Sequence, residues 1–243
     1  LLSISMLNDN GYKISKIAKM GRDEIHRFCG SLHDVNDEFA HQINALTLAM
    51  VELDEERFEK VFASNTLRYG FEETMTKLIY PFFERVGLLW QTGTVLPLHE
   101  HFVSNLVRQK LIVAIDAQLP VKGADVPKFV LFLPEGEMHE LSLLFACYLL
   151  RSRKNQVFYL GPNVPEDDLK SIHETCHPDY FLSILTASVG KEVTQGYIDR
   201  LSSNFPATKI LLSGIALDGL KAAASNISIL KKAADLLPYA TRR

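Results

Sequence analysis

A glutamate and a histidine two residues apart form the first group of side chains that could bind a metal. The stretch Glu137-Met-His139-Glu-Leu-Ser142 follows an apolar run typical of a β-strand and precedes a segment with helical spacing. An imidazole at such a junction can bind a metal through one nitrogen, while a nearby carboxylate accepts a hydrogen bond from the other. The same residues could instead cap the helix, and the hexapeptide alone favours that plainer interpretation.

A tryptophan, a glutamate and a histidine form the second group. Nine residues separate Trp90 from Glu100, and His101 follows directly. Taken alone, Trp90 is expected to be a core aromatic at the end of one helix. Glu100 and His101 are expected in the first turn of the next helix, where a carboxylate interacts favourably with the helix dipole. His99 is an additional candidate at this position.

The elements that must position the second group are helical. Apolar residues recur at helical spacing in four stretches between residues 34 and 119, which is typical of a four-helix bundle. Pro81 predicts a kink in the third stretch. The segment LLWQTGTVLPLHEH, which joins the third stretch to the fourth, predicts a loop or a broken helix.

The elements around the first group alternate between strand and helix. Short apolar runs (KFVLFLP, QVFYL, DYFLSIL, KILLSG) alternate with helical segments, and NISIL (226–230) predicts a fifth strand. This alternation predicts a parallel sheet covered by helices on both faces. Ligands of such folds bind at the carboxyl ends of the strands. We therefore expect residues at these ends, most of them small or polar, to line one site: Gly161, Ser183, Leu185, Thr186, Ser213 and Gly214.

Composition limits the class of protein. The chain has 243 residues, enough for about two domains, and a net charge of −3 gives no electrostatic footprint for nucleic acid. Three scattered cysteines and the lack of a signal peptide or long apolar run predict a cytoplasmic protein with no membrane segment. The chain does not begin with methionine, and we expect it to be a fragment or a cleaved product.

Taken together, the two groups resemble those of the cobalamin-dependent photoreceptor repressors of the MerR family (the CarH and LitR type). The segment LGPNVPEDDL and residues 1–25 resemble the corresponding parts of that family. The resemblance implies three parts. Residues 1–30 would be a remnant of a MerR-type winged-helix domain, residues 31–120 a four-helix bundle that caps the cofactor, and residues 126–243 a Rossmann-like (flavodoxin-like) cobalamin-binding domain.

The resemblance also implies a role for each residue toward adenosylcobalamin. His139 would ligate cobalt from below, with Glu137 as its orienting partner. Trp90 would shelter the adenosyl group on the upper face, Glu100 would hydrogen-bond it, and His101 would ligate cobalt after photolysis. The remaining cofactor-binding residues would lie along the nucleotide tail: Ser142, Gly161, Ser183, Leu185, Ser213 and Gly214.

The implied function is that of a light- and adenosylcobalamin-responsive transcriptional regulator. The chain would supply its sensor and oligomerisation region, form a dimer or tetramer, contact DNA through the missing N-terminal domain, and catalyse no reaction. Two departures leave alternatives open, because Ser142 and Ser213 stand where the family usually has glycine. One alternative is a methylcobalamin carrier module of a methyltransferase system, and the other is a cofactor-free regulator that retains the fold.

Overall fold

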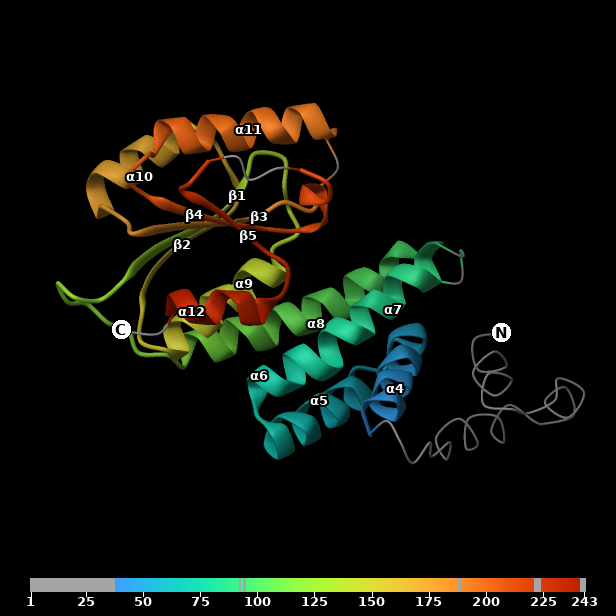
Figure 1. The fold of residues 1–243 in the computed structure, drawn as a ribbon. Helices are drawn as coiled ribbons and strands as arrows, with labels where there is room; N and C mark the ends of the chain where they lie inside the picture. Colours follow the sequence, from blue (N-terminus) through green and yellow to red (C-terminus); the bar gives the residue numbers. More distant parts are fainter. Residues whose placement is uncertain (1–37, 92, 94, 188, 221–223, 241–243) are drawn as a thin grey trace, which may run out of the picture. The chain divides into compact units, whose positions relative to one another are not determined.

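The computed structural model describes residues 38–91, 93, 95–187, 189–220 and 224–240. The chain falls into two compact units, with the boundary in the sequence between Leu106 and Val107. This boundary lies within helix α8 (Pro97–Asp116), so α8 contributes residues to both units. The predicted winged-helix remnant at residues 1–30 lies outside the described residues. Figure 1 shows the elements of each unit.

The first unit is helical. Its elements are α4 (Glu38–Glu52), α5 (Glu55–Tyr69), α6 (Phe71–Thr74), the π-helical turn η1 (Met75–Ile79), α7 (Tyr80–Gln91) and the first part of α8. Because α6, η1 and α7 follow one another directly, they form the third of the four predicted helical stretches, all of which are present among the described residues. Apolar side chains from every stretch are buried, among them Leu46, Met50, Phe58, Leu78, Phe82 and Val103.

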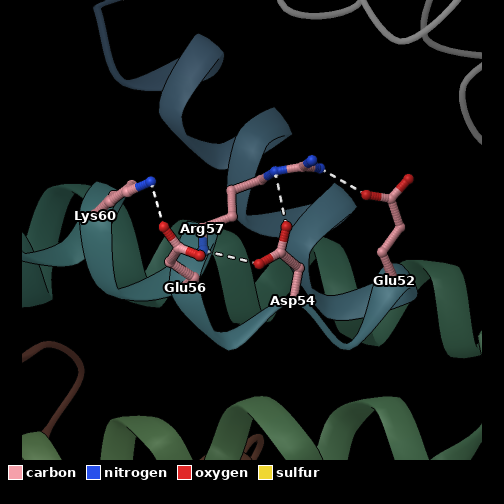
Figure 2. A network of polar contacts seen from close by, with 5 residues as sticks. All are labelled: Glu52, Asp54, Glu56, Arg57 and Lys60. Carbon is pink, nitrogen blue, oxygen red and sulfur yellow. Dashed lines mark hydrogen bonds and ion pairs between the residues drawn. The ribbon is translucent and has the colours of Figure 1, made fainter. Parts of the chain in front are cut away.

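A network of charged side chains fixes the turn between α4 and α5 (Figure 2). Asp54 caps α5, because its Oδ1 accepts a hydrogen bond from the backbone N–H of Arg57 at 2.9 Å. The Arg57 guanidinium contacts Asp54 Oδ2 at 3.4 Å and Glu52 Oε2 at 2.7 Å. A second pair, Lys60 and Glu56, lies one turn along α5. Local charge thus sets the point at which one helix ends and the next begins.

The third stretch contains a π-helical turn before Pro81, where a kink was expected. Proline has no N–H to donate to the carbonyl four residues earlier. Immediately before it, the helix widens into η1, where the N–H of Tyr80 donates to the carbonyl of Met75, five residues back. Such π turns are a known way to interrupt the α-helical ladder without ending the helix.

The second unit contains a parallel five-stranded sheet. Its strands are β1 (Lys128–Pro134), β2 (Gln156–Val164), β3 (Tyr180–Ile184), β4 (Lys209–Ser213) and β5 (Ile227–Leu230). The spatial order is β2-β1-β3-β4-β5, and every neighbouring pair is parallel. This is the flavodoxin-like order, in which ligands bind where the winding direction reverses, between β1 and β3. The predicted fold class and fifth strand are confirmed.

Helices cover both faces of this sheet (Figure 1). One face carries α10 (Asp168–Cys176) and α11 (Lys191–Asn204), and the other carries α9 (Leu141–Ser152) and α12 (Leu237–Ala240). The α10–α11 face holds a core cluster that includes Val130, Phe132, Phe181, Ile198, Leu201 and Leu212. No described helix has both the length and the apolar character needed to cross a bilayer.

Candidate cofactor-binding site

The turn between β1 and α9 holds Glu137 and His139 at the carboxyl edge of the sheet. Strand β1 ends at Pro134, and α9 begins at Leu141. Gly136 adopts a positive φ of 82°, and its N–H donates to Asn163 Oδ1 at 2.8 Å. The N–H of Asn163 donates in turn to the carbonyl of Glu137 at 3.3 Å. The end of β2 therefore supports the backbone of the turn.

The carboxylate of Glu137 is buried and accepts hydrogen bonds on both oxygens. Oε1 accepts from the backbone N–H of His139 at 3.0 Å and contacts His139 Nδ1 at 2.6 Å. Oε2 accepts from the backbone N–H groups of Thr186 and Ala187 at 2.7 and 2.6 Å. Burial by itself would raise the pKa of Glu137, but these hydrogen bonds outweigh it and lower the pKa to about 2. Glu137 is therefore ionised at neutral pH.

The ionised carboxylate fixes the tautomer of His139. A carboxylate has no proton to donate, so His139 Nδ1 must carry the proton of the short contact. The lone pair of the neutral ring then lies on Nε2. The side chain of His139 is 69% exposed, whereas that of Glu137 is 3% exposed. This combination places an imidazole that could bind a metal at the surface and the carboxylate that orients it in the interior.

The loops after β3 and β4 join the same edge, as predicted. Glu137 reaches the β3 loop through Thr186 and Ala187, and the N–H of Leu185 donates to the carbonyl of Ser213 at 2.8 Å. Gly214 has a φ of 118°, and an added Cβ would lie 2.2 Å from the carbonyl oxygen of Leu185. Only glycine fits this approach. The ends of β1, β3 and β4 are thus held together by hydrogen bonds, and the first two of these strands flank the switch point.

The residues expected along the nucleotide tail differ in their surroundings. Ser183 is fully buried, and its Oγ has no hydrogen-bond partner among the described residues. Ser213 Oγ donates to the carbonyl of Leu230 at 2.9 Å. Ser142 is half-buried in the first turn of α9, Leu185 is buried, and Gly161 is buried with a φ of 83°.

The orphaned hydroxyl of Ser183 fits a ligand that brings a polar group into the sheet edge, since buried hydroxyls normally have a partner. A corrin supplies four of the cobalt ligands itself, so a single protein imidazole is sufficient below it. His139 offers an exposed imidazole that could fill this place. The donor set of this unit therefore fits a cobalt corrinoid with a polar tail.

The residues expected on the upper face lie in the first unit. Trp90 is 59% exposed at the end of α7, so the expectation of a core aromatic is wrong. Glu100 and His101 lie in the first turn of α8, with side chains 41% and 71% exposed, and His101 Nδ1 contacts Glu100 Oε2 at 3.2 Å. His99 Nδ1 instead accepts the N–H of Leu96 at 3.0 Å.

No sequence pattern points to a third carboxylate, that of Glu140. This residue follows His139, and its side chain binds Arg108 Nε at 2.5 Å and the hydroxyl of Tyr159 at 2.9 Å. Burial, together with the neighbouring Glu140, raises the pKa of Tyr159 well above its ordinary value. The hydroxyl therefore keeps its proton and donates a hydrogen bond to Glu140. Partners 32 and 19 residues away leave no local pattern to find.

Comparison with known proteins supports a cobalamin or corrinoid cofactor. Residues 42–114 match the family model described as a B12 binding domain. The chain is 27% identical to the HTH-type transcriptional repressor CarH of Myxococcus xanthus over 216 residues, which is 85% of this chain and 70% of that protein. These two matches confirm the resemblance to CarH-type cobalamin-binding regulators.

A solved structure shares the fold of this chain. The solved structure of the Methanosarcina barkeri monomethylamine corrinoid protein superposes with a TM-score of 0.61, covering 80% of this chain and 94% of that one. At 15% sequence identity this likeness shows the fold alone.

Proposed function

We propose that this CarH-like chain is the sensor region of a transcriptional regulator that responds to adenosylcobalamin and to light. One observation carries the proposal: His139 is exposed, fixed in one tautomer by a buried ionised carboxylate, and located at the switch point of a flavodoxin-like sheet. The B12-binding match and the likeness to CarH supply the cofactor class.

On the lower side, His139 would bind cobalt through Nε2 in place of the cofactor's own dimethylbenzimidazole. Glu137 would keep the ring oriented and increase its basicity through Nδ1–H. The freed nucleotide tail would run along Ser142, Gly161, Ser183, Leu185, Ser213 and Gly214. The Ser183 hydroxyl would donate to or accept from a polar atom of the tail, which would satisfy a group that is otherwise buried without a partner.

On the upper side, Trp90 would cover the adenosyl group, and Glu100 would accept a hydrogen bond from it. His101 would become a second axial ligand after the group is lost. The sequence resemblance is the main support for these roles. The exposure of all three side chains in the first unit adds to it, since a side chain committed to the helical core could not reach a ligand.

When bound, the cofactor supplies a cobalt–carbon bond that green light breaks. Trp90 and Glu100 would hold the adenosyl group before this break and would lose that contact after it, and His101 would be the protein group available as a replacement ligand. A ligand shifts an equilibrium between protein states only by its differential affinity for them. We propose that this loss changes the assembly state of a dimer or tetramer, and that the cytoplasmic regulator then releases the DNA bound by its winged-helix domain. The chain itself would catalyse no turnover.

A corrinoid carrier module is the second candidate, because a helical bundle followed by a cobalamin-type sheet domain is also the layout of such modules. A carrier must expose its cobalt to a partner methyltransferase, whereas Trp90, Glu100 and His101 suit a sheltered adenosyl group. A cofactor-free regulator is the third candidate, because Ser142 and Ser213 narrow the path of the tail where glycine would open it.

Size exclusion in the dark and after green light tests the proposal. We expect the chain loaded with adenosylcobalamin to elute as a larger species in the dark and to shift to a smaller one on illumination. The chain loaded with methylcobalamin serves as a control for the adenosyl group. An unchanged elution volume with adenosylcobalamin bound would remove the light-sensing role. A chain that binds no cobalamin would favour the cofactor-free candidate.

A further inference from the structure

Helix α8 carries residues with two different proposed roles along one continuous helix. Glu100 and His101, the proposed contacts of the upper axial group, lie in its first turn. Arg108 lies about two turns further along the same helix. Its Nε donates to Glu140 Oε1 at 2.5 Å. A displacement of α8 along or about its axis therefore changes the Arg108–Glu140 contact.

Three elements converge on the carboxylate of Glu140. Arg108 binds one oxygen from α8, and the hydroxyl of Tyr159 on β2 donates to the other at 2.9 Å. Glu140 also precedes α9, where its carbonyl accepts the N–H of Leu144 at 2.9 Å. The side chain is only 14% exposed. Because Glu140 follows His139 directly, a force on this carboxylate acts on the backbone of the proposed cobalt ligand.

Fold stability is a poor explanation for this contact. The Arg108 side chain is 48% exposed, and ion pairs with a solvent-exposed partner contribute little to the free energy of folding. Two donors that hold the two oxygens of a mostly buried carboxylate do, however, fix its position. The geometry therefore indicates that Arg108 and Tyr159 hold the Glu140 carboxylate in position.

We propose, on the basis of the cobalamin function above, that Glu140 is a positioning residue that couples the two axial sides of cobalt. Through Arg108, the upper axial group that α8 senses would influence the orientation of His139 below. Coupling of this kind is a free energy that both sites share. It follows that the preference of the protein between cobalamins with different upper ligands depends on Arg108 and Tyr159.

The test compares the affinity for adenosylcobalamin with that for hydroxocobalamin, measured by absorbance titration in the dark. We expect Arg108→Met to change the ratio of the two affinities about tenfold toward unity, within the range typical of coupled sites. Tyr159→Phe should change it in the same direction by less. Arg200→Met is the matched control, since it removes an ion pair to Glu166 at 3.1 Å from an arginine 58% exposed on α11. This control should leave the ratio unchanged.

The possible outcomes are distinct. A purely structural role would lower both affinities together and leave their ratio unchanged in Arg108→Met, which would overturn the coupling. If Arg108→Met fails to fold, an unchanged ratio in Tyr159→Phe overturns it equally. A parent protein that binds both cobalamins with the same affinity also contradicts the coupling but leaves the cobalamin function intact. A parent protein that binds neither cobalamin contradicts the proposed function itself.

Discussion

At the scale of single residues, the Glu137 carboxylate meets four donor groups: three backbone N–H groups and the ring nitrogen of His139. An amide at this position would turn its own NH₂ toward donors on one side. We expect Glu137→Gln to lower the free energy of unfolding by about 2–3 kcal/mol at neutral pH, because buried donors are left unsatisfied. Urea denaturation measures this change. Glu135→Gln, in the exposed part of the same turn, is the control and should change it little. Equal stabilities of the two variants would contradict the role assigned to Glu137.

The pKa of Glu137 also predicts a dependence of stability on pH in the cofactor-free protein. Its pKa is lowered from 4.5 to about 2 on folding. A lowered folded-state pKa stabilises the protein fully above the unfolded value, and this stabilisation is lost as the pH falls through the folded value. The difference corresponds to about 3 kcal/mol, which should disappear between about pH 4.5 and pH 2. Urea titrations of the parent and Glu137→Gln across this range should converge at the acid end. A constant difference would refute the assignment.

Gly214 offers a third residue-scale prediction. We expect Gly214→Ala to destabilise the protein by about 3 kcal/mol or more, because its backbone conformation favours glycine and the new Cβ would clash with the backbone of Leu185. Gly136→Ala is the matched control, since Gly136 also has a positive φ but has no atom within 4 Å of an added Cβ. It should cost about 1 kcal/mol. Thermal unfolding measures the stability of both variants. An equal loss of stability would show that the positive φ, and not the clash with Leu185, causes the destabilisation.

At the scale of elements, the cap of α5 should contribute more than the ion pairs on its surface. Asp54→Ala removes the side chain that accepts the N–H of Arg57 and should lower the free energy of unfolding by about 1 kcal/mol. Glu56→Ala removes only the exposed partner of Lys60 (Figure 2), and we expect almost no effect. Urea denaturation of both variants checks the order, and the reverse order would be inconsistent with the capping geometry.

Most helices and strands can be predicted from the sequence, but irregular turns and the exposure of single side chains often cannot. The strands were recognisable because buried parallel strands are continuous apolar runs between helical segments, and even the short β5 (Ile227–Leu230) was found. The π turn before Pro81 cannot be predicted in this way, because a helix can accommodate the missing N–H of proline by either a kink or a wider turn. The exposure of Trp90 was missed because a large aromatic at the end of an amphipathic helix is normally buried.

At the scale of the whole molecule, some contacts of the candidate site can be predicted from the sequence and others cannot. Glu137 and His139 lie two residues apart, so their pairing could be inferred from spacing. The backbone donors of Thr186 and Ala187 could not, because any residue type supplies an N–H. Arg108 and Tyr159 reach Glu140 only through the fold. Sequence alone therefore predicts the Glu137–His139 pair better than the contacts that hold it.

The central claim is that a protein histidine, rather than the cofactor's own base, binds cobalt from below. Electron paramagnetic resonance of the bound cobalt(II) cobalamin tests it most directly, because one axial nitrogen splits the cobalt lines. With nitrogen-14 throughout, each line should be a triplet whichever base is bound. When only the protein carries nitrogen-15, coordination by His139 predicts doublets, and this splitting should be lost in His139→Ala. Triplets that persist in the labelled protein would show that dimethylbenzimidazole remains bound, and would contradict the account.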